Sequence, residues 1–134
     1  MKTLSPFVLA LVVVSTTGCP MTMDRPSTLT RLRAAIDEAV EGPTVLEDHN
    51  QLVEDIVRSA VFEGMYESQI QESLGRGDDC GVREMCREHG FRESDWTYEV
   101  GRQPGDPSLP AGPTLIIGFD RQGHVSRTYY VTRR

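Results

Sequence analysis

Residues 114–131 read TLIIGFDRQGHVSRTYYV, and this stretch decides the fold because alternating apolar residues stand on both sides of a turn. Apolar side chains at every second position are typical of a strand with one buried face. Residues 120–123 separate the two strands and end on a glycine, as short hairpin connections do. The first strand contributes three inward residues, Leu115, Ile117 and Phe119. The stretch therefore predicts an antiparallel hairpin.

The second strand, residues 124–131, carries Tyr129 and Tyr130 side by side. Adjacent residues of a strand face opposite sides of the sheet. If Val125 and Tyr129 face the core, Arg127 interrupts the inward face and Tyr130 points away from it. We therefore expect Tyr130 to be available to a partner.

A third strand is predicted over residues 95–100, where Trp96, Tyr98 and Val100 alternate with polar residues. The loop between this strand and the hairpin, residues 101–113, holds four prolines and three glycines and is too broken for regular structure. Aromatic side chains in so small a domain either fill the core or form an exposed patch. The partner-binding candidates on the sheet are Trp96, Tyr130 and Arg127.

The helical period governs the first half of the chain and predicts four helices. They span residues 27–41, 44 to about 60, 66–74 and 82–89. Ser27 is expected to cap the first helix, and Thr44 forms a capping box with Glu47 at the start of the second. His49 is expected to be a packed or half-exposed residue rather than a metal ligand, because no cysteine or second histidine lies one turn away. The predicted fold is α+β, a two-layer sandwich of N-terminal helices packed on a three-stranded antiparallel sheet.

The N-terminal residues suit an export signal. Lys2 precedes an apolar run, residues 4–14, that is too short to cross a hydrocarbon core as a helix. Gly18 and Cys19 follow this run. The pattern resembles a bacterial lipoprotein signal, although Thr16 departs from the usual leucine. The resemblance implies cleavage before Cys19 and acylation of its thiol. The alternative is an ordinary cleaved signal, which we disfavour because exported proteins rarely keep an unpaired thiol.

This reading divides the chain into a signal peptide (1–18), a tether (19–26), an accessory N-terminal helix (27–43) and a small α/β domain (44–134). The expected location is the cell envelope, with acylated Cys19 in the lipid bilayer. Pro20 follows the cysteine where an aspartate would favour the inner membrane. The outer membrane is therefore expected, with the domain facing the periplasm or the cell surface.

The charge of the chain excludes one broad class of partner. The 134 residues carry a net charge of -6, and nucleic-acid binding needs a basic face. Residues 24–99 hold 18 acidic and 8 basic side chains, whereas residues 100–134 hold 2 acidic and 5 basic ones. We expect no nucleic-acid partner. The uneven charge indicates either a solvated acidic helical half or an interface on the arginine-bearing C-terminal part.

Cys80 and Cys86 are the two remaining thiols if Cys19 is acylated. Residues six apart in a continuous helix lie about 9 Å apart, because each residue rises about 1.5 Å. A disulfide needs Cα atoms within about 7 Å, so Cys80 is expected in a turn that Gly81 permits. An oxidising envelope favours this disulfide. The alternative, a metal site with His89, lacks a fourth ligand and a usual zinc spacing.

Several short motifs follow one another in the second half of the chain. They are, in order, Gly64-Met65, Gln69-Ile70, Leu74-Gly75, Trp96-Thr97-Tyr98 and residues 119–125. This order resembles that in the SmpA/OmlA small outer-membrane lipoproteins and the β-lactamase inhibitory proteins, which share a fold. The resemblance covers about residues 60 to 131. Tyr66 stands where these families have a capping threonine. The resemblance implies helices packed on an antiparallel sheet, and protein docking rather than catalysis.

No nucleophile elbow, metalloprotease helix or phosphate loop is present in the sequence, so we expect no catalytic residue, metal or cofactor. The leading hypothesis is an envelope lipoprotein that docks another envelope protein in outer-membrane structure or assembly. The first alternative is an inhibitor or ligand-binding module that uses the sheet face or the loop 101–113. A hydrolase ranks last.

Overall fold

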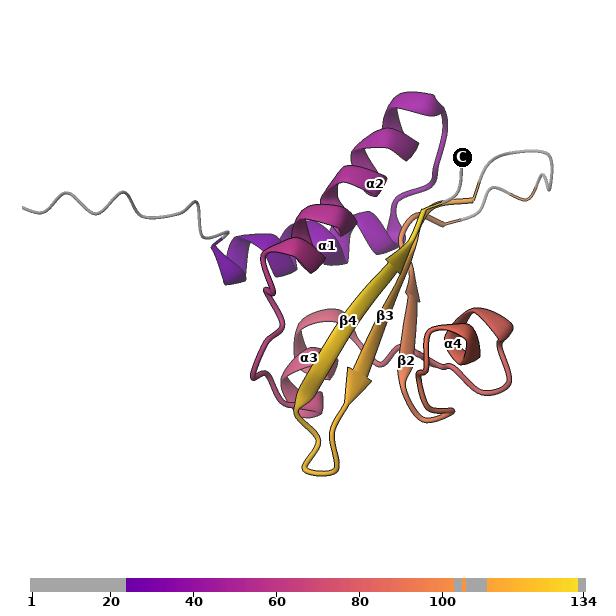
Figure 1. Cartoon of the computed structure of the whole chain (residues 1–134). Helices are drawn as coiled ribbons and strands as arrows, with labels where there is room; N and C mark the ends of the chain where they lie inside the picture. The colour runs from indigo at the N-terminus through magenta and orange to yellow at the C-terminus, as the bar shows by residue number, and fades with distance from the viewer. Residues whose placement is uncertain (1–23, 103–104, 106–110, 133–134) are drawn as a thin grey trace, which may run out of the picture.

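The computed structural model describes residues 24–102, 105 and 111–132. The strands form one antiparallel sheet in the order β1-β2-β3-β4. Figure 1 shows α1, α2 and α3 on one side of this sheet and α4 on the other. The α+β prediction is confirmed. The elements are α1 (Arg25–Asp37), α2 (Pro43–Arg58), α3 (Glu67–Leu74), β1 (Asp78–Asp79), α4 (Glu84–Glu88), β2 (Trp96–Glu99), β3 (Thr114–Phe119) and β4 (Val125–Val131).

The sheet has one strand more than the sequence predicted. Asp78 and Asp79 of β1 pair with Thr97 and Trp96 of β2. A strand of two exposed residues has no alternating pattern, so the sequence showed only a polar turn there. The prediction of a three-stranded sheet was therefore wrong, whereas its three predicted strands are present as β2, β3 and β4.

Both predicted caps of the first two helices were wrong. Asp24, not Ser27, caps α1, and its carboxylate accepts hydrogen bonds from the Ser27 backbone and hydroxyl. These bonds lower the pKa of Asp24. Helix α2 begins at Pro43 with no side-chain cap, because proline presets the helical φ at this position and supplies no N–H that needs a partner.

Helix α1 ends at Asp37, several residues before its predicted end. The residues after α1 turn away and form backbone hydrogen bonds with Arg102. We call residues 101–102 the neck of the loop 101–113. The Arg102 N–H donates to the Glu38 carbonyl (2.8 Å), and the Val40 N–H donates to the Arg102 carbonyl (3.4 Å). His49 is buried beside this neck, with Nε2 3.1 Å from a Glu38 carboxylate oxygen, which confirms it as a packed residue.

An extra residue in β4 shifts the β3–β4 ladder. Phe119 pairs with Val125, but the preceding residue of β3, Gly118, pairs with Arg127. Ser126 is therefore unmatched, as in a β-bulge. A bulge inverts the alternation of the residues that follow it, because one residue is inserted into a period of two.

The bulge exchanges the faces of the two tyrosines of β4. Val125, before it, is buried in the main core. After it, Tyr130 packs against the main core and Tyr129 is 38% exposed on the other face. The predictions that Tyr129 faces the core and that Tyr130 faces away were therefore wrong.

The sheet is covered on both faces, so the two-layer prediction was incomplete. Ile116 and Ile117 are neighbours in β3, face opposite sides and are both 0% exposed. Ile117 belongs to the main core beneath α1, α2 and α3, which also contains Leu32, Ile56 and Trp96. Ile116 belongs to a minor core on the α4 side. The minor core consists of Cys80, Cys86, Phe91 and Ile116, with Met85 packed against it.

The start of α3 is tied to the β3–β4 hairpin. The Val125 N–H donates to the Met65 carbonyl and the Glu67 N–H donates to the Gly123 carbonyl, both at 2.8 Å. The Gln69 side chain accepts from the Tyr66 N–H, and the Gln69 N–H, which a capping threonine would bind, donates instead to the Tyr66 carbonyl at 2.9 Å. The residues at the start of α3 thus anchor the hairpin.

Candidate protein-interaction surface

Strand β4 forms the edge of the sheet. Its residues pair with β3 on one side, except for Ser126 at the bulge. On the outer side, the Val125 N–H is bonded to Met65. Within residues 24–102, 105 and 111–132, no strand or bridge pairs with the outer side of residues 126–131. Edge strands present unpaired N–H and C=O groups to which another strand can bond.

Arg127 is held above the minor core by a stack of side chains. Gly118 has no Cβ, and an added Cβ would lie 3.0 Å from the Phe91 ring. The bare glycine therefore admits Phe91 against the sheet. The Arg127 guanidinium lies 4.0 Å from the centre of the Phe91 ring and donates to the His89 carbonyl at 2.6 Å. Arg127 is thus exposed but fixed in orientation, by a cation–π contact and a charged hydrogen bond.

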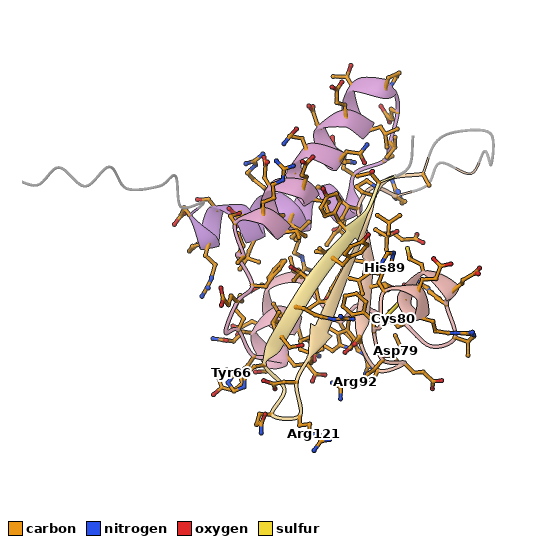
Figure 2. The ribbon with its side chains drawn as sticks, in the orientation of Figure 1. Tyr66, Asp79, Cys80, His89, Arg92 and Arg121 are labelled. Carbon is orange, nitrogen blue, oxygen red and sulfur yellow. A yellow bond between two sulfur atoms is a disulfide. The ribbon has the colours of Figure 1, made fainter. Side chains whose placement is uncertain are left out.

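Tyr129 lies next to Arg127 on the same face of β4. Its ring stacks on His89 with 4.0 Å between ring centres. Figure 2 shows His89 on the α4 side of the sheet. We call the outer edge of β4 together with Arg127, Tyr129 and His89 the β4 surface. Tyrosine and arginine are enriched where protein interfaces gain most of their binding energy, because they bury a large contact area and form hydrogen bonds at its rim.

The structure separates the three residues proposed from the sequence as partner contacts. Trp96 is 2% exposed in the main core and offers no surface to a partner. Tyr130 is half-buried against the same core. Arg127 lies on the exposed β4 surface. Of the surface residues that sequence reasoning missed, Tyr129 was detectable, because the isolated Gly118 in a strand pattern indicates a bulge.

The Cys80–Cys86 disulfide is present, as predicted, with Cα atoms 5.9 Å apart. Cys80 precedes a turn in which Gly81 adopts a φ of 55°. The disulfide fixes the short helix α4 against the sheet and so positions His89 and Phe91. Because both sulfurs are bonded to each other, neither is a thiolate that could bind a metal.

Among the residues that the structure describes, no group of three His, Cys, Asp or Glu side chains is placed to bind a metal ion. Burial raises the pKa of Tyr98, whose hydroxyl donates to the Gly75 carbonyl at 2.6 Å. Tyr98 is therefore a buried structural tyrosine beneath the end of α3.

Several predicted features lie outside the described residues. These are the signal peptide, most of the tether with Cys19, and most of the loop 101–113. Among the helices that the structure describes, none is long and apolar enough to cross a membrane. Comparisons with protein-family models, curated proteins and solved structures found no match.

Proposed function

We propose that this protein is an envelope lipoprotein, held by an acylated Cys19, whose α+β domain docks another envelope protein through the β4 surface. The observation that carries the docking proposal is the outer edge of β4, which is unpaired from residue 126 to residue 131 among the described elements. Docking is non-catalytic, in agreement with the SmpA/OmlA resemblance, and the outer membrane is the proposed location.

The sequence and the disulfide support the location. Gly18 and Cys19 follow an apolar run, as in lipoprotein signals. The Cys80–Cys86 disulfide is typical of an oxidising compartment such as the bacterial envelope.

The chemistry of β4 favours an extended segment as the bound part of the partner. An added strand satisfies the free backbone groups of an edge, while side chains at its rim give specificity. Natural edges are commonly blocked by charged side chains, proline or a bulge. The edge of β4 has a bulge at Ser126 and one charged residue, Arg127, whereas residues 128–131 contain neither a charge nor a proline. Arg127 and Tyr129 are fixed beside this edge and favour a partner segment that carries carboxylate or amide side chains.

The docking test places a photo-crosslinking benzoylphenylalanine at Tyr129 in the full-length protein in cells. We expect a crosslink to an envelope protein. The matched control is Tyr66, which is 49% exposed and stacks on His124 with ring centres 4.1 Å apart. Figure 2 shows Tyr66 near the tip of the hairpin, away from His89.

Crosslinking at position 66 but not at 129 would contradict the β4 proposal. Capture of a single secreted enzyme would contradict the assembly role and favour the inhibitor alternative.

Anchoring is tested separately with a fatty-acid probe. We expect label on the wild type and none on Cys19→Ala; an unlabelled, soluble wild type would refute the lipid anchor.

A further inference from the structure

We infer that α1 rests on the anionic surface of the membrane and that a groove beside α1 takes the phosphate of a lipid headgroup. This inference rests on the lipid anchor of the proposed function. It adds a second, non-covalent contact with the membrane and an orientation for the domain.

The groove lies between α1 and the C-terminal end of α3 and has a volume of about 580 Å³. Arg25 and Arg33 line it, together with apolar side chains of α1 that include Leu29 and Ala34. Ser73 closes it from α3. Two cationic groups beside an apolar wall match a phospholipid at the interface, whose phosphate is charged and whose adjoining glycerol ester region is less polar.

The arginines of the groove are fixed in place without losing their charge. Arg25 donates to the carbonyls of Val61 (2.8 Å) and Glu63 (3.2 Å), and Arg33 donates to the Ser73 carbonyl at 3.4 Å. Carbonyl oxygens orient a guanidinium but do not neutralise it. Throughout the described residues, no carboxylate forms an ion pair with either arginine.

The arginines of α1 lie between acidic residues at its two ends. Arg25, Arg31 and Arg33 are in the helix, whereas Asp24 caps its start and Asp37 and Glu38 stand at its end. Arg25 and Arg33 line the groove with Leu29 between them, because residues four apart lie on the same face of a helix. Residues 38–99 hold 16 acidic and 5 basic side chains. An anionic surface would therefore attract this arginine-bearing face and repel much of the helical half that follows.

The length of the tether brings α1 to the membrane. Cys19 precedes Arg25 by six residues. A chain spans at most about 3.5 Å per residue, so an acylated Cys19 holds the start of α1 within about 21 Å of the acyl chains. Because the anchor confines α1 to the membrane surface, a weak contact with headgroups is sufficient.

The test uses the full-length protein, acylated and held by its own anchor in phosphatidylcholine vesicles with or without phosphatidylglycerol. A nitroxide is attached at Thr30→Cys on α1, or at Gln122→Cys in the hairpin turn as the control. Relaxation by a nickel-chelating lipid reports proximity to the bilayer. We expect stronger relaxation at position 30 than at 122, and a loss of this difference without phosphatidylglycerol.

Charge variants test the arginines. An arginine near an anionic surface contributes about 1 kcal/mol, so Arg31→Gln and Arg33→Gln should each lower the ratio of docked to free domain about fivefold. Arg58→Gln on α2 is the matched control, because Arg58 is already paired with Glu54. It should leave the ratio unchanged, and all three variants should keep the unfolding midpoint of the wild type.

Two results would overturn the inference while leaving the anchor intact. One is equal relaxation at positions 30 and 122 in protein that floats with the vesicles. The other is a stronger relaxation at position 30 than at 122 that does not depend on lipid charge, which would show that the anchor alone brings α1 to the bilayer. Protein that fails to float would instead refute the anchor, and with it the proposed function.

Discussion

At the scale of single residues, Gly101 has no room for a side chain. Its φ is +101°, and an added Cβ would lie 2.6 Å from Val40 and 2.9 Å from Nδ1 of His49. Gly101 therefore allows the neck of the loop 101–113 to pack directly against the end of α1 and the middle of α2.

Gly101→Ala should lower the free energy of unfolding by at least about 2 kcal/mol, because the left-handed backbone and the overpacked neck both become strained. Urea unfolding at equilibrium measures this loss. Gly105→Ala is the control, since none of the residues that the structure describes lies within 4 Å of its Cβ position. Equal stabilities of the two variants would show that the neck is not packed as described.

At the scale of elements, the disulfide compensates for the small size of α4. This helix has five residues, and the minor core beside it contains four buried side chains. So few contacts stabilise a helix weakly, since helices this short rarely persist on their own in water. The covalent link between Cys80 and Cys86 therefore fixes the segment that carries His89 and Phe91.

Replacing both cysteines by alanine should lower the free energy of unfolding by about 2 kcal/mol, because the unfolded chain is no longer constrained by the short loop. Relative to the wild type, amide hydrogen exchange should accelerate more in residues 84–91 than in α2. The reduced wild type should behave like the double variant. An unchanged unfolding midpoint in both would contradict the stabilising role of the disulfide.

At the scale of the whole molecule, the sheet separates two surfaces with different proposed roles. Helix α1 lies on the main-core side, whereas Arg127 and Tyr129 lie with the minor core on the other side. Figure 1 shows this separation in the opposite positions of α1 and α4. A domain that contacts the membrane through α1 would therefore direct these two side chains away from the bilayer, toward other proteins.

The covering of both faces of the sheet can be tested with neighbouring residues. Ile116→Ala and Ile117→Ala should each lower the free energy of unfolding by about 2–5 kcal/mol, because both side chains are fully buried. If an alanine variant does not fold, the corresponding isoleucine-to-valine variant should lower the free energy of unfolding by about 1 kcal/mol. Val82→Ala, at a side chain that is 77% exposed, is the control. A neutral Ile116 variant would contradict the minor core.

The sequence by itself determined the features that depend on neighbours along the chain. Alternation fixed β2, β3 and β4, and the distance geometry of a six-residue spacing placed Cys80 in a turn. The four helices were also found, because their apolar periods are local. Their ends were less predictable, since Arg102, distant in sequence, bonds the residues at which α1 stops.

Only the tertiary structure decided which side chains reach the surface. The bulge at Ser126 depends on the register between two strands and exchanges Tyr129 with Tyr130. The two-residue strand β1 exists only through its pairing with β2. Phe91 is buried only because Gly118, which has no side chain, leaves space for its ring on the face of the sheet. Strand register and layer packing are set by contacts between distant segments, and a local sequence pattern does not contain them.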